Sequence, residues 1–307
     1  MNLTGLLSKM LMLFLFLCIG ILCSKTNIID QHGSTVINKI VLYICTPALT
    51  IYSVLTSGPD FSIGDVLMLL VYAFAFNLLA LLLGWFFSIV FCRRREERGT
   101  FHLVTAFGNV AFMGYPVVSA VYGSSAIFLA SVCTMPFNLF LYSIGGLLVS
   151  ENKEKGIPWR KAFFNPAVIS TLIAMAFFFL NVSLPAVLTD SIAYLANMVV
   201  PLSMIVIGSS LGRMKAKSVL LRWQYYAVSL CKLILFPLIL FFLFRIFIHD
   251  QMLLGLLFIL ALMPTAAMTS VLSAEYGGDS DFANGSIFIS TVLSLATVPL
   301  MIFLFLL

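Results

Sequence analysis

The 307-residue sequence contains few charged residues and few histidines. Only 9% of its residues are Asp, Glu, Lys or Arg, whereas an ordinary soluble domain contains about 25%. There are 3 histidines, and hydrophobic residues make up 62% of the chain. So few charges could not cover the surface of a soluble protein of this size. The composition excludes a cytosolic globular enzyme, a disordered chain and a nucleic-acid binder, and it indicates a polytopic α-helical membrane protein.

The sequence also lacks the usual patterns of metal sites and intramembrane enzymes. None of the six cysteines belongs to a C-x-x-C pair, and no H-E-x-x-H motif is present. Gly277-Gly278-Asp279 is not the G-x-G-D motif of an intramembrane protease, because Tyr276 stands at the first glycine position. We interpret the cysteines as small apolar packing residues. The sequence therefore predicts no cofactor, no metal and no enzymatic activity.

The sequence is dominated by long apolar runs. A membrane-spanning helix needs about 20 predominantly apolar residues, and ten such runs can be drawn. No clear small-x-small cleavage site follows the first run, so we expect it to remain as a span. The fold class predicted is an all-α polytopic membrane protein with ten transmembrane helices. The runs are 5–23, 38–56, 63–92, 101–121, 126–149, 165–181, 186–211, 219–248, 252–274 and 283–307.

The basic residues gather in alternate loops between these runs. If the spans alternate in direction, 14 of the 17 Lys and Arg residues fall on one face. Such a face is cytoplasmic, so both termini are predicted to be extracytoplasmic in the cell membrane. The 14 residues are Lys25, Lys39, Arg93, Arg94, Arg95, Arg98, Lys153, Lys155, Arg160, Lys161, Arg213, Lys215, Lys217 and Arg222.

Features of the first five runs recur in the last five at a nearly constant distance. Because five is odd, two such halves must cross the membrane in opposite directions, as in many secondary transporters. We predict a first five-helix repeat at 1–150, a cytoplasmic linker at 151–164 and an inverted repeat at 165–307. The matching features are Pro47 and Pro201, 154 residues apart, Tyr122-Gly123 and Tyr276-Gly277, also 154 apart, and Asn77 and Lys232, 155 apart.

The fourth and ninth runs each combine helix breakers with small and polar residues. Proline cannot donate a backbone hydrogen bond, and freed backbone groups at membrane depth persist only inside protein or beside a wet cavity. Paired interruptions in the two halves point to a transport site, where helix N-termini attract an anion. Taken at the prolines, the breaks lie 148 residues apart, which is off the repeat register. The candidate site residues are Asn109, Gly114, Tyr115 and Pro116 in the fourth run, and Pro264, Thr265, Thr269 and Ser270 in the ninth.

Lys232 stands in the middle of the eighth run. An ionisable residue inside a span is a functional candidate, since its insertion costs about 2.5–3.5 kcal/mol. It is interpreted as a counter-ion to an anionic substrate or as a proton carrier; the alternative is a structural lysine bonded to freed carbonyl groups. Asn77 and Asn138 are further mid-span polar candidates for substrate binding. No Asp or Glu lies mid-span, which argues against a carboxylate-based proton or sodium relay.

Three stretches resemble one family of carriers. Residues 108–116, Gly-Asn-Val-Ala-Phe-Met-Gly-Tyr-Pro, resemble the G-N-[TV]-x-[FY]-[LM]-G-x-P signature of the auxin efflux carrier family. Residues 263–266 with 274–279 look like its second crossover, and residues 38–49 are similar to its second span. The resemblance implies ten spans in two inverted five-helix repeats with crossing broken helices, and transport of an organic anion. The short central loop resembles the bacterial branch, which includes malate and malonate permeases.

These observations predict a secondary active transporter for a small organic anion, a carboxylate in the first instance. It would work by alternating access at a midplane site between the two broken helices. A membrane channel or a sensor for a small solute is the alternative, although nothing in the sequence is typical of a selectivity-filter loop. The expected partners are the anion, a proton or a sodium ion as coupling ion, and membrane lipid; a homodimer is left open, and no nucleic acid is expected.

Overall fold

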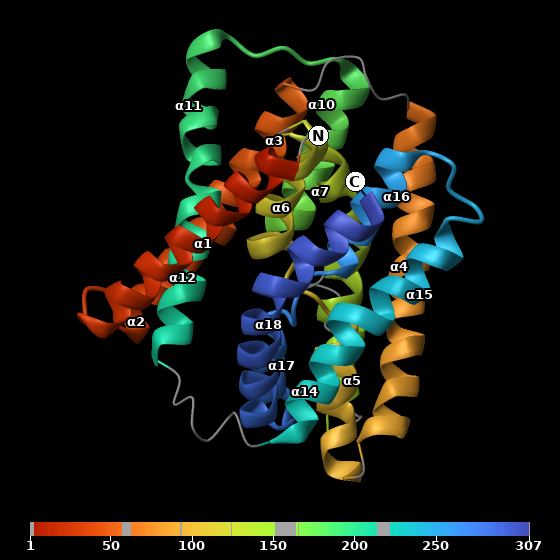
Figure 1. Ribbon diagram of the computed structural model, residues 1–307. Helices are drawn as coiled ribbons and strands as arrows, with labels where there is room; N and C mark the ends of the chain where they lie inside the picture. The colour runs from red at the N-terminus through yellow and green to blue at the C-terminus, as the bar shows by residue number, and fades with distance from the viewer. Residues whose placement is uncertain are drawn as a thin grey trace. The chain divides into compact units, whose positions relative to one another are not determined.

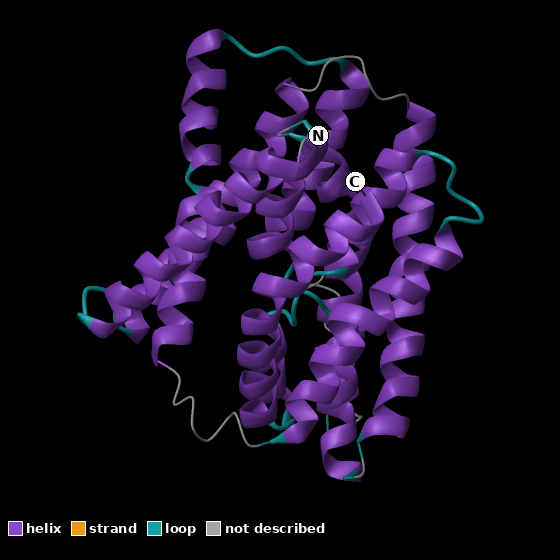
Figure 2. Ribbon diagram, viewed as in Figure 1, coloured by secondary structure: helices purple, strands orange, loops and turns teal. Residues whose placement is uncertain are grey.

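The computed structural model describes residues 3–56, 63–92, 94–123, 125–150, 164, 166–213 and 222–306. Within these ranges the chain is helical and forms no strand apart from one isolated bridge (Figures 1 and 2). The prediction of an all-α protein is therefore confirmed. Arg93, most of the predicted linker and the basic residues Lys215 and Lys217 lie outside the described residues.

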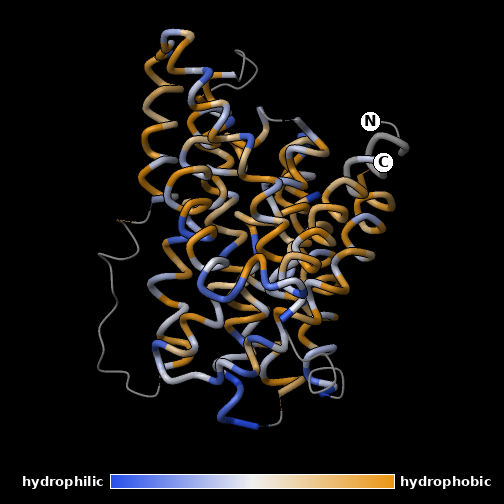
Figure 3. Tube along the Cα trace, turned by 90° about the vertical axis from the view of Figure 1, so that its left-hand side faces the viewer, coloured by the Kyte–Doolittle hydropathy of each residue, from blue (hydrophilic) through white to orange (hydrophobic). Residues whose placement is uncertain are grey.

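Each of the ten predicted apolar runs is helical over most of its length. Within the described ranges, six helical stretches are long and apolar enough to cross a membrane by length and composition, and four shorter apolar helices accompany them. Figure 3 shows how strongly apolar residues dominate these helices. Many large apolar side chains on them are exposed, among them Leu82, Trp85 and Phe86 on one helix. Exposed apolar surface on this scale suits a lipid environment rather than water.

The chain divides into two compact units, and each takes segments from both predicted halves of the sequence. The first unit comprises Met1–Leu70, Ala111–Met135 and Phe164–Met214. Its elements are α1 (Leu3–Lys25), α2 (Gln31–Ile40), η1 (Val41–Cys45), α3 (Thr46–Thr56), the start of α4 (Ile63–Phe91), most of η3 (Val110–Gly114), α6 (Tyr115–Tyr122), most of α7 (Ala126–Phe140), α10 (Pro166–Leu180), α11 (Ala186–Asn197) and α12 (Val199–Arg213).

Glycines lie in the most extensive helix contact of the first unit, between α1 and α12 (Figure 1). A Cβ atom at Gly20 would overlap the carbonyl group of Ile205, and one at Gly208 would overlap the carbonyl group of Leu17. Small residues let the backbones of membrane helices approach each other closely, so that dispersion forces hold them without a hydrophobic driving force.

The second unit comprises Val71–Val110, Pro136–Phe163 and Lys215–Leu307. It holds both observed interruptions, which follow Ala106 and Ala261. Its further elements are η2 (Arg95–Glu97), α5 (Arg98–Ala106), η4 (Leu141–Gly145), α8 (Gly146–Val149), α14 (Trp223–Leu230), η5 (Cys231–Leu235), α15 (Phe236–Phe244), α16 (Gln251–Ala261), α17 (Met268–Tyr276) and α18 (Ser280–Leu306).

A buried ion pair and tight glycine contacts fasten the second unit near the start of α5. Arg222 donates to the buried Glu97 carboxylate at 2.6 Å, and its guanidinium lies over the rings of Tyr225 and Phe282, 5.7 and 5.5 Å from their centroids. A Cβ atom at Gly285 would overlap the Tyr225 ring. These contacts join α14 and α18 to the turn η2, which directly precedes α5.

π-Helical turns explain why several prolines inside the predicted spans do not break them. The amide of Thr46 donates to the carbonyl of Val41, and the amide of Phe236 donates to that of Cys231, five residues back in each case. A proline follows directly at 47 and at 237. The wider turn makes room for the proline ring and accommodates the hydrogen bond that proline, lacking an N–H, cannot donate. The span therefore continues as a helix.

Candidate functional site

The ninth run is broken where the sequence predicts. Helix α16 ends at Ala261 and α17 begins at Met268, with a non-helical segment between them. Pro264 stands inside this segment. Its ring would clash with the carbonyl four residues back, and it disfavours helical geometry in the residue before it. The prediction of an interruption at Pro264 is confirmed.

The fourth run is broken earlier than predicted. Helix α5 ends at Ala106, and Phe107 is extended, so the break lies at 107–109 rather than at Gly114 and Pro116. Gly114 closes a π-helical turn, and Pro116 is the second residue of α6. Proline is tolerated in the first turn of a helix, and here the π-helical turn before it also makes room for its ring. The expectation that Pro116 breaks the span was wrong.

The corrected position also removes the discrepancy in the spacing of the breaks. The two interrupted helices end at Ala106 and Ala261, which are 155 residues apart. That distance agrees with the spacing of Asn77 and Lys232. The value of 148 came from using Pro116 as the landmark, although this proline lies beyond the break.

The two breaks lie side by side and pair through their backbones. Gly108 and Thr265 form an isolated antiparallel bridge. The amide of Asn109 donates to the carbonyl of Pro264 at 2.6 Å, and the amide of Ala266 donates to the carbonyl of Phe107 at 3.0 Å. Each break thus satisfies backbone groups that the other leaves without a helical partner. Each non-helical segment therefore stabilises the non-helical conformation of the other, although the two are far apart in sequence.

Side chains complete the crossover on the Thr265 side. The Thr265 amide donates to Ser290 Oγ at 3.2 Å, and its hydroxyl donates to the carbonyl of Val104 at 3.0 Å. The amides of Asn109, Thr265 and Ala266 are therefore engaged within the protein. The expectation that free amides at the breaks attract an anion does not apply to these three groups. Ser290 and Val104 were not predicted; the spacing of Ser286, Ser290 and Ser294, four residues apart, is the signal that could have found the serine.

Lys232 lies beside the first break. It belongs to the π-helical turn η5 and is 1% exposed. A Cβ atom at Gly108 would lie 3.1 Å from both Cε and Nζ of this lysine, so the absence of a side chain at 108 makes room for the ammonium group. Nζ is 4.8 Å from the centroid of the Phe236 ring. Among the described residues, none forms a hydrogen bond or an ion pair with Nζ.

The other predicted polar residues of the second unit differ in their surroundings. Asn77 is buried, and its Nδ2 donates to the Ala73 carbonyl of its own helix at 2.7 Å. Thr269 is bonded to the carbonyl of Ala266 at 2.7 Å. Asn138 on α7 and Ser270 on α17 are half-buried. The hydroxyl of Thr269 and the amide of Asn77 are thus occupied within their own segments, which is the usual structural role of polar groups in membrane helices.

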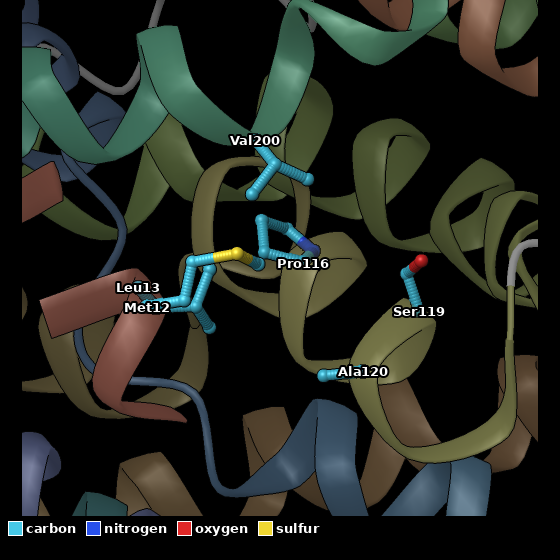
Figure 4. A pocket seen from close by; sticks show the side chains of 6 residues that line it. All are labelled: Met12, Leu13, Pro116, Ser119, Ala120 and Val200. Carbon is cyan, nitrogen blue, oxygen red and sulfur yellow. The ribbon is translucent and has the colours of Figure 1, made fainter. Parts of the chain in front are cut away.

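Gly114, Tyr115 and Pro116 belong to the first compact unit. The hydroxyl of Tyr115 is buried and shares a hydrogen bond of 2.8 Å with Thr134. Pro116 borders a cavity of about 120 Å³, where Figure 4 shows the side chains of Met12, Pro116 and Val200 pointing toward the same space. The cavity is lined by Met12, Leu13, Pro116, Ser119, Ala120 and Val200.

A membrane-embedded chain with paired helix breaks and a buried lysine beside them has the features of a membrane transporter. The chain belongs to the family described as membrane transport protein, which matches residues 6–302. This match confirms the resemblance to the auxin efflux carriers. The protein is thus a multi-pass membrane transport protein and not an enzyme.

Three similar proteins are also named as transporters. An uncharacterized transporter of Methanocaldococcus jannaschii is 28% identical over 299 residues, which cover 94% of this chain and 96% of the relative. An uncharacterized transporter of Methanothermobacter thermautotrophicus is 26% identical over 305 residues, covering 96% and 97%. A protein of Rhizobium meliloti, provisionally named a malonate transporter, is 24% identical over 302 residues, covering 91% and 89%.

Proposed function

We propose that the protein is a secondary active transporter for a small organic anion of the carboxylate class. The binding site lies at the crossover of the two helix breaks, and Lys232 provides its positive charge. One observation carries the proposal: Lys232 is 1% exposed, lies beside the first break, and forms no hydrogen bond or ion pair with the described part of the chain.

A lysine in such a place calls for a negative partner. Burying an ammonium group is costly unless the charge is paired. Carboxylate side chains are absent from the middle of the spans, so the protein offers Lys232 only partial negative charges there, and a full negative charge has to come with the substrate. A carboxylate substrate satisfies the ammonium group while it is bound. The relative provisionally named a malonate transporter supports this class of substrate.

We further propose ten membrane spans in two inverted five-helix repeats, working by alternating access. Matching helix ends support the duplication. Helices α6 and α17 end at Tyr122 and Tyr276, and each is followed by a glycine with positive φ, 88° at Gly123 and 87° at Gly277. The distribution of basic residues supports a cell-membrane protein with both termini extracytoplasmic. The sequence contains no nucleotide-binding motif, so an ion or substrate gradient supplies the energy.

Uptake into proteoliposomes tests the proposal. The purified protein is reconstituted, and the initial rate of uptake is measured for a panel of labelled mono- and dicarboxylates. We expect saturable uptake of at least one of them, together with counterflow. For Lys232→Met we expect the rate at low substrate concentration to fall about thirtyfold or more, because losing one member of a buried charge pair costs about 2 kcal/mol or more.

Lys39→Met is the matched control, because Lys39 is exposed on α2. This variant removes the same charge and should transport normally. Normal transport by a folded Lys232→Met protein would remove Lys232 from the site. Flux that rises linearly with the gradient and shows no counterflow would indicate a channel instead of a carrier.

A further inference from the structure

The aromatic ring of Phe236 faces the buried ammonium group of Lys232. Nζ lies over the ring, 4.8 Å from its centroid, and the two residues are 2% and 1% exposed. The face of an aromatic ring carries partial negative charge and attracts a cation within about 6 Å. This attraction is strongest where water is excluded. The ring therefore offers Lys232 an uncharged partner within the protein.

Phe236 belongs to the same continuous helical segment as the lysine. It stands four residues after Lys232, where η5 passes into α15, and its amide donates to the carbonyl of Cys231. Residues four apart are neighbours on one face of a helix. The Met263 carbonyl oxygen and Nζ both lie 3.1 Å from a Cβ atom placed at Gly108, but Met263 and Gly108 belong to the two breaks. Their place beside the lysine depends on how the breaks pair, whereas the ring stays with the lysine when this segment moves.

A second ring fixes the orientation of the first. Phe76 on α4 lies against Phe236, with the ring centroids 5.5 Å apart and the ring planes at 71°. Edge-to-face pairs of this kind are a preferred arrangement of aromatic rings. Phe76 is itself 6% exposed, so the pair is enclosed by protein. Packing therefore maintains the ring face that is turned toward Nζ.

A carrier passes through states with and without its anion, and the ring acts differently in the two. While a carboxylate is bound, its charge neutralises the ammonium group and is itself repelled by the ring face. Without the carboxylate, the ring face remains beside the ammonium group. A group that interacts more strongly with the empty state shifts the equilibrium toward that state. Such a group eases the return of the empty carrier and weakens the binding of the anion.

We propose that Phe236 is a positioning residue that holds the ammonium group of Lys232 while the carrier returns empty. The inference rests on the proposed function as an anion carrier. Loss of the ring then has two opposite effects. The empty carrier returns more slowly, and the anion binds more tightly. A residue that only fills space would not produce both effects.

Comparing net uptake with exchange tests the inference. Net uptake into empty vesicles requires the empty carrier to return, whereas exchange against substrate inside the vesicles does not. Labelled malonate is the first probe, followed by the other carboxylates of the panel. Phe236→Leu keeps the apolar bulk and removes the ring. We expect the ratio of net uptake to exchange to fall about tenfold, and the KM for exchange to fall as well.

Phe258→Leu is the matched control. Phe258 is buried in the second unit and lies against the rings of Phe241 and Phe305. Among the described residues, no cation lies over its ring. Its replacement should leave the ratio of net uptake to exchange unchanged.

Fluorinated phenylalanines at position 236 separate the charge of the ring from its shape. Each fluorine withdraws electron density from the ring face and changes its volume little. We expect the ratio of net uptake to exchange to fall stepwise as fluorines are added. An unchanged ratio across the series, or equal losses of both modes in Phe236→Leu, would overturn the inference and leave the anion carrier intact. Absence of saturable flux of every carboxylate by the unaltered protein would instead refute the anion carrier, and this inference with it.

Discussion

Asn77 and Lys232 occupy matching positions in the two halves of the chain, 155 residues apart, yet their surroundings differ. Both are buried in the second compact unit, at 2% and 1% exposure. The amide of Asn77 is bonded to the carbonyl of Ala73 in a continuous helix. Lys232 sits in a π-helical turn beside the break after α5. One position serves the packing of a helix, and the other brings charge to the crossover.

The difference shows what a buried charge requires. A membrane helix can satisfy an amide side chain locally, through a carbonyl of its own preceding turn. It cannot neutralise an ammonium group in that way, because a single carbonyl does not offset the loss of hydration. Lys232 is accommodated because two helix ends and a glycine meet beside it. The predictions that follow use pairs of matched positions to test this contrast.

The largest effect is expected from Asn77→Lys. This change gives both halves a lysine at the matched position, but α4 has no break there. We expect a loss of stability of about 2.5–3.5 kcal/mol, the cost of a charge in the middle of a membrane helix. Thermal unfolding in detergent measures it, with Asn77→Ala as control, for which only about 0.6 kcal/mol is at stake. If the lysine variant is as stable as the alanine variant, the matched positions are equivalent after all.

A smaller loss is expected from Ser290→Ala. The change removes the acceptor of the buried Thr265 amide in the second break, which costs about 1–3 kcal/mol. Ser294→Ala is the matched control, since its hydroxyl is bonded only to the carbonyl of Thr291 in its own helix. The midpoints of thermal unfolding of the two variants are compared. Equal midpoints would mean that the crossover does not depend on Ser290.

The smallest difference is expected between Gly123→Ala and Gly277→Ala. Gly123 has φ 88° and ψ 173°, whereas Gly277 has φ 87° and ψ 17°. The first conformation is nearly restricted to glycine and costs another residue about 1–3 kcal/mol. The second is left-handed helical and costs about 1–2 kcal/mol. Gly123→Ala should therefore lower the unfolding midpoint more. The reverse order would show that the two helix ends are held by other contacts.

Much of the fold could be predicted from the sequence, because hydropathy is a local property. The ten apolar runs coincide with helices. The break at Pro264 was predictable because proline cannot donate the backbone hydrogen bond of a helix and its ring clashes with the preceding turn. The first break could not be placed from its proline. Pro116 is absorbed by a π-helical turn, and the actual opening at 107–109 depends on pairing with residues more than 150 positions away.

The candidate site shows the same division. The rarity of charge in the spans was sufficient to single out Lys232, and the motif at 108–116 identified the chain as a carrier. The sequence does not reveal that the amides of Asn109 and Thr265 are bonded within the crossover, because their partners Pro264 and Ser290 are chosen by packing.

The sequence by itself determined that this protein is a membrane transporter built of apolar helices. It also showed that one lysine, Lys232, stands in the middle of a membrane span, where charged residues are rare. The tertiary structure decided which backbone groups at the breaks are occupied and that Lys232 ends beside Gly108. The physical reason is the range of the forces. Burial of apolar residues follows from each segment's own composition, whereas hydrogen-bond partners and the balance of a buried charge depend on segments that meet only in the folded chain.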